Sequence, residues 1–207
     1  HQPQDEVRNT LPPVLDEIVR KSGSSRAGQK ACLRLMEMRF LGLPETVETA
    51  RQKINMCDEF RRLYPSSEWT VQILTTEAQL LSDQLGEHQR ALELYQAAVT
   101  TSGRKALLRH VASCHAKLGD YSKAAAAQAE YLAERPEDDY GILQLIQYQL
   151  QAGMITEGMA RAEELKKRTI SQYIKDRLAD LLKEYVRVFP DGTRVPETGV
   201  SLAVRGA

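Results

Sequence analysis

The sequence lacks an excess of charge of either sign. Lys plus Arg number 28 and Asp plus Glu number 28, so the formal net charge is zero. Proteins that bind nucleic acid through its phosphates need basic groups to neutralise them, and this balance counts against such a role. The chain also has no polybasic run of the kind that attracts anionic membranes, and no apolar run long enough to span a bilayer. We therefore expect no direct insertion into a membrane.

Cysteine is scarce, and its pattern argues against disulfides and against a zinc site. Cys32, Cys57 and Cys114 are odd in number, widely spaced and without a CxxC pair. They fall within apolar helical patterns, which predicts free buried thiols in a reducing compartment. The chain begins at His1, which is compatible with processing, truncation or a tag. Processing together with free thiols favours the mitochondrion, with the cytoplasm as the alternative.

Aromatic residues make up only 6% of the chain, and strand-type runs are nearly absent apart from a short stretch after Pro196. Strong helix formers are abundant, so we expect an all-α protein of about ten helices. We read the second and third helices as one hairpin, and Pro44 as the start of the third. The helices whose limits the sequence indicates span residues 11–21, 25–41, 44–64, 67–85 and 171–188.

A repeat becomes visible in the middle of the chain. Gly86, Gly119 and Gly153 are 33 and 34 residues apart, and each is followed five positions later by a small residue. A glycine permits the tight turn between two helices, and a small residue lets the second helix approach the first. The residues at later positions would fill the space between successive pairs. A period near 34 with this layout predicts a helical-repeat solenoid. Five residues after the three glycines stand Ala91, Ala124 and Gly158. Nine residues after them stand Tyr95, Gln128 and Ala162, and twelve residues after them stand Ala98, Tyr131 and Leu165.

At these residues the chain resembles the tetratricopeptide repeat family. In the segment 118–136, Gly119, Tyr121, Ala124 and Pro136 fall where that family places its turn glycine, aromatic residue, small residue and closing proline. The segment 85–98 is similar. The unit at 140–167 is looser and also resembles a pentatricopeptide repeat.

The resemblance implies a right-handed α-solenoid of antiparallel helix hairpins. The organisation that we expect is an N-terminal extension with a short helix (1–23), a degenerate hairpin (24–66), three repeats (67–168), a capping helix (169–190) and an extended tail (191–207).

The resemblance also implies where a partner would bind. In this family the first helix of each pair lines a concave face that holds peptides or partner helices. Carried over by position, the groove residues are Ile73, Thr76, Leu80, Arg109, Ser113, Lys117, Leu143, Gln147 and Gln151. The Lys, Asn and Arg set with which some members clamp a C-terminal carboxylate is missing.

Candidate chemistry is sparse. His110 and His115 are five residues apart, so they do not share a helix face as an i, i+4 metal pair would. His88 and Trp69 are interpreted as packing residues. The basic clusters 104–110 and 166–168 are interpreted as solvated surface, with an acidic partner or RNA as the alternative. No phosphate loop, nucleophile elbow or HExxH motif is present, so we expect no catalysis, no metal, no cofactor and no small-molecule substrate.

The leading hypothesis is therefore a non-catalytic scaffold, an accessory or adaptor subunit of a larger assembly, possibly mitochondrial, with protein partners. One alternative is a pentatricopeptide-type RNA-binding protein, although Ala106 and Gly141 stand near the positions that would read bases and cannot do so. Another alternative is a helical-repeat accessory protein of a membrane-protein insertion or trafficking complex.

Overall fold

The computed structural model describes residues 3–168, 170–188 and 194–196, with side chains described for 13–168 and 170–185. The chain divides into two compact units, His1–Ser102 and Gly103–Ala207. We call them unit 1 and unit 2. The array of three repeats predicted at 67–168 crosses this boundary, and its continuity remains a prediction.

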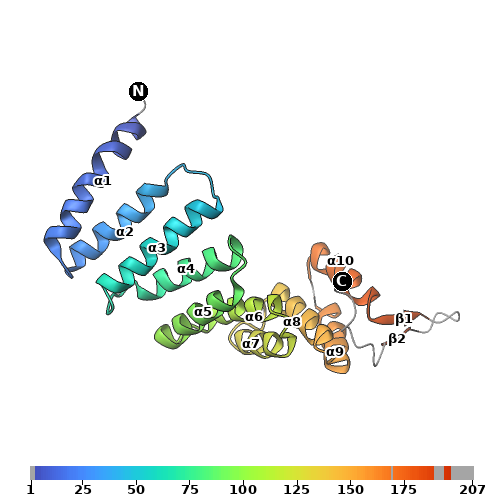
Figure 1. Cartoon of the computed structure of the whole chain (residues 1–207). Coiled ribbons are helices and arrows are strands. Elements are labelled where there is room, and N and C mark those ends of the chain that lie inside the picture. The colour runs from blue at the N-terminus through green and yellow to red at the C-terminus, as the bar shows by residue number, and fades with distance from the viewer. Residues whose placement is uncertain (1–2, 169, 189–193, 197–207) are drawn as a thin grey trace. The chain divides into compact units, whose positions relative to one another are not determined.

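Unit 1 contains five antiparallel helices, which lie side by side in chain order (Figure 1). Helix α4 packs closely on α5, and α3 packs on both α2 and α4. The helices are α1 (Pro3–Ser22), α2 (Arg26–Phe40), α3 (Val47–Leu63), α4 (Thr70–Asp83) and α5 (His88–Ser102).

Two helix starts in unit 1 differ from the sequence prediction. Helix α1 begins at Pro3, so Pro12 and Pro13 lie inside it rather than in its first turn. Helix α3 begins at Val47, not at Pro44, because Thr46 and Thr49 form a reciprocal capping box. The capping box fixes the start of the helix, which leaves Pro44 in the preceding loop.

The expected hairpin of the second and third helices is also looser than the sequence suggested. Helix α2 packs most extensively on α1, and only slightly on α3. Gly28 allows this close approach, since a Cβ atom there would lie 2.6 Å from the carbonyl oxygen of Gly23. Leu15 of α1 packs with Ala31 and Leu35 of α2 in one buried cluster. The segment predicted as an N-terminal extension is therefore one half of a hairpin.

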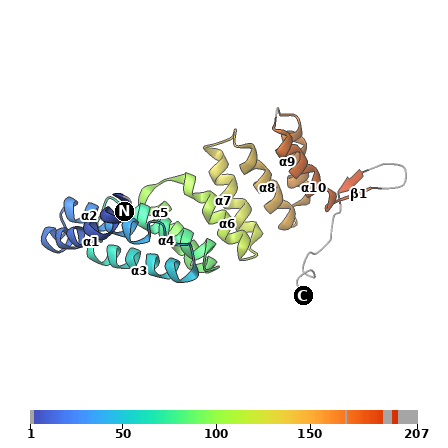
Figure 2. The ribbon, with the colours of Figure 1, turned by 90° about the horizontal axis from the view of Figure 1, so that it is seen from above.

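Unit 2 contains two further hairpins, α6/α7 and α8/α9, followed by α10 (Figure 2). Helix α7 packs on α8, and α10 packs on α8. The elements are η1 (Lys105–Leu107), α6 (Leu108–Lys117), α7 (Tyr121–Ala133), α8 (Asp139–Gln151), α9 (Ile155–Lys166), α10 (Gln172–Lys183), β1 (Val186–Val188) and β2 (Arg194–Pro196).

The prediction that the last helix reaches Val188 is wrong. Helix α10 ends at Lys183, and Val186 to Val188 form a strand that pairs antiparallel with residues 194–196. β-branched valines favour an extended backbone, and the Pro-Asp-Gly sequence at 190–192 is a turn signal that permits the chain to return. Residues 194–196 of the predicted tail therefore belong to a small β-ribbon, and residues 189–193 and 197–207 lie outside the described residues.

The three spaced glycines occupy the left-handed region that the sequence predicted, with φ of 67° at Gly86, 81° at Gly119 and 79° at Gly153. In unit 2 each of these glycines closes a Schellman motif. The amide of Asp120 donates to the carbonyl of His115, and that of Met154 donates to Gln149, at 2.9 and 2.8 Å. These bonds use carbonyls that a helix end would otherwise leave unpaired.

All nine recurring positions are buried, as the period predicted. Ala91, Ala98, Ala124, Gln128 and Ala162 are fully enclosed, with relative exposures of 0%. At Gly158 a Cβ atom would lie 2.8 Å from the side chain of Leu150, so the smallest residue is required for that contact. Among the described helices, none is long and apolar enough to cross a membrane.

Candidate partner-binding grooves

Unit 1 carries an open groove of about 530 Å³ between α2, α3 and α4, which we call the unit 1 groove. Its size lies within the range of sites that hold small molecules or peptide side chains. The lining is mainly apolar and comes from three helices and one loop. The lining residues are Leu33, Met36, Glu37, Phe40, Leu41, Gly42, Leu43, Glu45, Lys53, Cys57, Gln72, Ile73 and Thr76.

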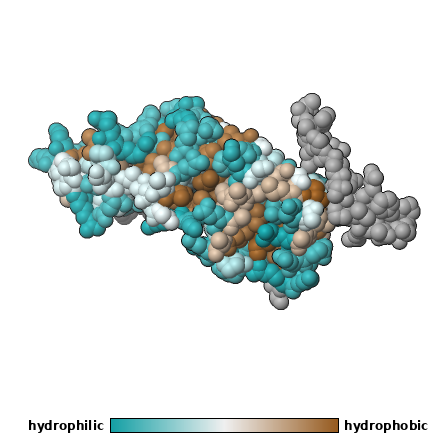
Figure 3. All heavy atoms as spheres, turned by 90° about the horizontal axis from the view of Figure 1, so that it is seen from below, coloured by the Kyte–Doolittle hydropathy of each residue, from teal (hydrophilic) through white to brown (hydrophobic). Residues whose placement is uncertain are grey.

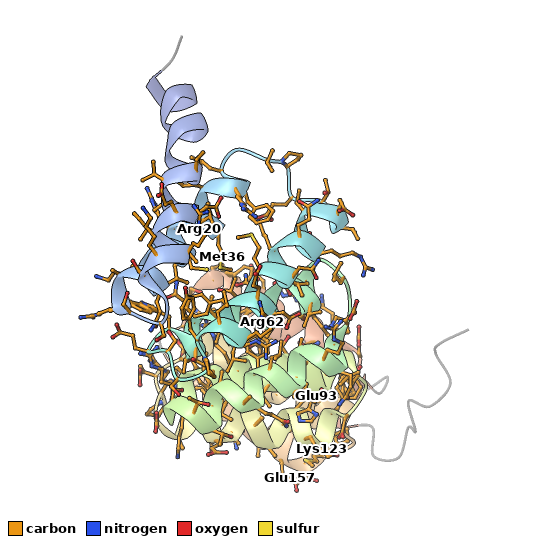
Figure 4. All side chains as sticks on the ribbon, turned by 60° about the vertical axis from the view of Figure 1, so that its left-hand side comes forward. Arg20, Met36, Arg62, Glu93, Lys123 and Glu157 are labelled. Atoms are coloured by element: carbon orange, nitrogen blue, oxygen red, sulfur yellow. The ribbon has the colours of Figure 1, made fainter. Side chains whose placement is uncertain are left out.

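The apolar wall of this groove follows from the helical spacing of α2. Leu33, Met36 and Phe40 recur at intervals of three and four residues, so they share one face. Figure 4 labels Met36, which packs against the buried cluster of α2, α3 and α4. The loop after α2 extends the wall, because Leu41 and Leu43 are 60% and 39% exposed on either side of Gly42. These two leucines form the edge of the groove.

Three charged groups stand at the rim of the unit 1 groove. The ammonium group of Lys53 lies 3.6 Å from Oε1 of Glu45 and 5.5 Å from the ring centre of Phe40. Glu37 accepts a hydrogen bond of 2.7 Å from the guanidinium of Arg34. The side chains of Glu37 and Glu45 are 62% and 69% exposed, whereas that of Lys53 is 26% exposed. The rim therefore turns its carboxylates outward and its single ammonium inward.

The floor of the unit 1 groove is closed by Cys57 and Ile73, whose exposures are 0% and 2%. Burial raises the pKa of the Cys57 thiol to about 12, so the thiol stays protonated at neutral pH. Behind the floor lies Glu77, 2% exposed, with one carboxylate oxygen 3.0 Å from the guanidinium of Arg61. Arg61 also pairs with Asp58. Burial raises the pKa of the Glu77 carboxyl, and the neighbouring Arg61 opposes that shift.

Unit 2 carries a second groove, of about 320 Å³, between α8 and α10, which we call the unit 2 groove. It has an apolar base and polar walls. Leu143 and Tyr185 are only 6% and 8% exposed, while carboxamides and charged groups stand above them. The lining residues are Leu143, Gln147, Gln151, Arg177, Asp180, Leu181, Glu184 and Tyr185.

The polar walls of the unit 2 groove are held by local contacts. Lys183 donates to Oδ1 of Asp180 at 2.7 Å, and this hydrogen bond lowers the pKa of the Asp180 carboxyl. Burial raises the pKa of the Tyr185 hydroxyl. The carboxamide oxygen of Gln151 is enclosed and has no hydrogen-bond partner among the described residues. The lining of the unit 2 groove is therefore more polar than that of the unit 1 groove.

The structure groups five of the nine predicted groove residues into these two grooves. Ile73 and Thr76 line the unit 1 groove, and Leu143, Gln147 and Gln151 line the unit 2 groove. Leu80, Arg109, Ser113 and Lys117 line neither of the two. Leu80 and Ser113 are half-buried, and Arg109 and Lys117 are exposed. The binding role of all nine remains a proposal.

Sequence reasoning missed the residues that α2, its following loop and α10 add to the grooves. The sequence pattern favours a separate hairpin of α2 and α3, and a terminal helix with one buried face, so neither element was expected to line a groove. The Leu-Gly-Leu sequence at 41–43, which places two large apolar residues in a short loop, was the available signal.

The other candidates of the sequence reduce to packing and surface. Trp69 packs against the cluster that contains Cys57 and Ile73, with the guanidinium of Arg26 5.9 Å from its ring centre. Burial lowers the pKa of His115. Within the described ranges, no group of three or more His, Cys, Asp or Glu side chains is placed to hold a metal ion. In the basic cluster 166–168, Arg168 lies 3.3 Å from Asp139 and Lys166 lies 2.6 Å from Glu163.

Exposed apolar residues are not confined to the grooves. Figure 3 shows several hydrophobic patches on one face, separated by hydrophilic side chains. Val14 and Tyr173, for example, are 52% and 59% exposed. Scattered exposure of this kind is ordinary in folded proteins. The unit 1 groove differs because its exposed leucines border a concave, apolar surface.

No protein-family model matches the sequence, and no curated protein matches it. Solved structures of similar fold exist. One is the crystal structure of MamA, with a TM-score of 0.59 and 11% identity over 87% of this chain and 98% of that chain. Another is the crystal structure of a Podosopora anserina putative kinesin light chain with nearly identical TPR-like repeats, with a TM-score of 0.53 and 10% identity over 87% of this chain and 90% of that chain. The chain therefore has a tetratricopeptide-like helical-repeat fold.

Proposed function

We propose that the chain is a non-catalytic scaffold that holds protein partners in its two grooves, as an accessory subunit of a larger assembly. The observation that carries the proposal is the unit 1 groove, where Leu41 and Leu43 leave apolar surface exposed beside a concave wall. Burying such surface against a partner contributes about 25 cal/mol for each Å² removed from water. The helical-repeat fold supports the proposal, because stacked helix pairs create extended binding surfaces.

RNA binding is less well supported. Gly141, one of the positions that would read a base, is buried, and its carbonyl accepts a hydrogen bond of 3.0 Å from Gln128. Ala106 is half-buried and offers no hydrogen-bonding side chain. The zero net charge of the chain supplies no general attraction for phosphates.

The test is affinity capture from a native extract with matched variants of the chain, followed by mass spectrometry and RNA quantification. One variant carries Leu41→Gln and Leu43→Gln in the unit 1 groove. A second carries Arg177→Ala and Glu184→Ala in the unit 2 groove. We expect the wild type to recover a defined set of proteins in stoichiometric amounts, and at least one groove variant to lose part of that set.

The matched control carries Arg62→Ala and Lys123→Ala, both exposed and away from the two grooves (Figure 4). It should capture the same proteins as the wild type. Equal capture by both groove variants and the control would contradict the proposal. RNA that survives high-salt washing would favour the pentatricopeptide alternative. The identity of the captured set distinguishes a mitochondrial complex from a membrane-insertion or trafficking complex.

A further inference from the structure

Helices α3 and α4 meet through two neighbouring contacts, one apolar and one ionic. Cys57 and Ile73 belong to one buried cluster and form the floor of the unit 1 groove, with relative exposures of 0% and 2%. Arg61 and Glu77 form the ionic contact. Arg61 stands four residues after Cys57, and Glu77 stands four residues after Ile73, so the ionic contact lies about one helical turn from the floor. The ionic contact therefore adjoins the floor of the groove.

The ionic contact has two carboxylates for one guanidinium. The Nη2 atom of Arg61 lies 3.0 Å from Oε2 of Glu77, and the same atom contacts Oδ1 of Asp58. The Nε atom of Arg61 and the Oε2 atom of Glu77 are both enclosed, and neither makes a hydrogen bond within the described part of the chain. When Glu77 is ionised, the guanidinium therefore balances only one of two negative charges.

Helix α5, which also packs on α4, does not supply the missing positive charge. Arg90 of α5 acts through space on the Glu77 carboxyl and favours its ionised form. Arg90 is itself paired with Glu87, at 2.5 Å. Two cations, Arg61 and Arg90, thus stand against three carboxylates, those of Asp58, Glu77 and Glu87. The cluster carries an excess of negative charge whenever Glu77 is ionised.

We infer that Glu77 is a proton-controlled latch between α3 and α4, which holds the floor of the unit 1 groove closed while its carboxyl group is protonated and lets the floor open when the proton leaves. A neutral carboxyl group can stay buried beside Arg61. The carboxylate must either draw the guanidinium away from Asp58 or reach water. The inference goes beyond the scaffold, because it concerns movement of the floor in the absence of any partner.

The direction of the effect follows from the two states of the floor. Burial raises the pKa of Glu77, and the neighbouring Arg61 opposes that rise. The closed floor, in which Glu77 is buried, therefore keeps the proton up to a higher pH than the open floor does. Opening of the floor should increase as pH rises.

Thiol labelling of the full chain measures the opening, because Cys57 is fully buried while the floor is closed. Wild type and Glu77→Gln are labelled with a small disulfide reagent at several pH values, and the readout is the ratio of their Cys57 rates. We expect this ratio to rise about threefold as Glu77 ionises, since Glu77→Gln has no proton to lose. After burial, the charge of Glu77 is the next cause that raises the pKa of the Cys57 thiol, which slows labelling of the wild type. That influence opposes the expected rise and cannot imitate it.

Cys32 of α2 is the internal control. It belongs to the same buried cluster as Cys57, but burial and then the charge of Glu59 raise its pKa. Local opening between α3 and α4 should raise the ratio of rates for Cys57 alone, whereas unfolding of unit 1 exposes both thiols. An equal rise at Cys32 would overturn the latch, because the rise would then report global unfolding.

Two further comparisons test the charge balance. Asp58→Asn frees the guanidinium of Arg61 for Glu77. Its Cys57 rate, divided by that of Asp58→Asn with Glu77→Gln, should therefore stay nearly level across the pH range. A rise that persists in this pair would exclude the shared guanidinium as the cause. Glu93→Gln removes the same charge at an exposed site of α5, and the ratio of the wild type to this variant should stay level (Figure 4).

The outcomes separate the latch from the proposed function. A level ratio for wild type and Glu77→Gln would overturn the latch, as would an equal rise with Glu93→Gln. Neither result bears on the scaffold, whose test is the capture of partners by the groove variants. Loss of that test would in turn leave the latch standing, because the labelling experiment contains no partner.

Discussion

Units 1 and 2 use the same helical frame but differ in the polar groups that they bury. Unit 1 buries a carboxylate, that of Glu77, behind an apolar groove and pairs it with the half-buried Arg61. Unit 2 encloses a neutral amide, Gln128, and its groove is walled by carboxamides and charged groups. The stacking of the helices depends on glycine turns and on small residues between helices. The residues that line each groove can therefore vary without disturbing the stacking. The difference gives the chain two grooves of different chemistry.

The largest effect that would sharpen this comparison is expected at the floor of the unit 1 groove. Because burial raises the pKa of Cys57 to about 12, its thiolate at neutral pH should be about a thousandfold scarcer than that of a free cysteine. Cys32, in the same cluster, has its pKa raised to about 11. We expect both thiols to resist a disulfide reagent in the native chain and to react rapidly in urea.

The measurement is the rate of thiol labelling, with the modified residues identified by mass spectrometry. Fast native labelling of Cys57 would mean that the floor opens to solvent. A floor that opens in this way would remove the contrast between an apolar and a polar groove.

The second prediction concerns the ion pair of unit 1. Arg61→Met leaves the carboxylate of Glu77 buried without its partner, and we expect a loss of about 3 kcal/mol in the free energy of unfolding. The matched control is Arg62→Met, since Arg62 is 72% exposed and 3.8 Å from Glu59. It should change the free energy of unfolding by less than about 0.5 kcal/mol. Urea denaturation followed by circular dichroism measures both variants, and similar losses in the two would contradict the importance of the buried pair.

The third prediction concerns the neutral counterpart in unit 2. Gln128→Met removes the hydrogen bond to the carbonyl of Gly141 but also removes a carboxamide oxygen that has no partner among the described residues. We expect a loss of about 1 kcal/mol, since a buried neutral group costs less than a buried charge when its partner is lost. The same denaturation experiment measures it. A loss as large as that of Arg61→Met would erase the distinction between the two units.

The smallest effect is a dependence on pH. Burial raises the folded-state pKa of Glu77 above its ordinary value of 4.5, so the folded chain holds this proton more tightly than the unfolded chain. The contribution of Glu77 to stability is complete below the ordinary value and declines as pH rises through the folded-state value. Glu77→Gln cannot ionise, so it should gain stability relative to the wild type as pH rises above the ordinary carboxyl value of 4.5 and through the raised folded-state value.

Denaturation of the two proteins at several pH values checks the sign. If the wild type instead gains stability relative to Glu77→Gln as pH rises, the attraction of the Glu77 carboxylate to Arg61 outweighs the cost of its burial. In unit 2, hydrogen bonds from Lys123 and Lys183 lower the pKa of the Asp120 and Asp180 carboxyls, the opposite direction to that of Glu77 in unit 1.

The frame could be predicted from the sequence because its signals are local. Gly86, Gly119 and Gly153 mark the turns, and the residues that follow at fixed intervals mark the buried faces. The Leu-Gly-Asp sequence at 118–120 supplies both the left-handed glycine and the amide that closes the turn. Each of these signals lies within one short stretch of chain, so a reading of the sequence recovers it.

The grooves could be predicted only in part, because each joins residues that are distant in the chain. Thr76 and Phe40 share a groove only through the packing of α3 on α2 and α4, and Gln147 meets Arg177 only through the packing of α10 on α8. The apolar pattern of α10 continues past the last residue of the helix, so the sequence does not show where the helix ends. Tyr185 continues the apolar stripe of the helix although the helix ends at Lys183, and the strand that pairs with Val186 to Val188 lies further along the chain, at residues 194–196.

The bond from Gln128 to Gly141 also bears on how unit 2 unfolds. It crosses from the hairpin α6/α7 to the hairpin α8/α9, at a place where Gly141 lies so close to α7 that a Cβ atom there would be 3.1 Å from Leu132. In a linear stack of repeats, cooperativity depends on the strength of each interface between neighbours. A hydrogen bond that is completely enclosed at that interface couples the two hairpins, so opening either one breaks it. Unit 2 should accordingly lose both hairpins in a single transition, rather than fray from its last helix inward.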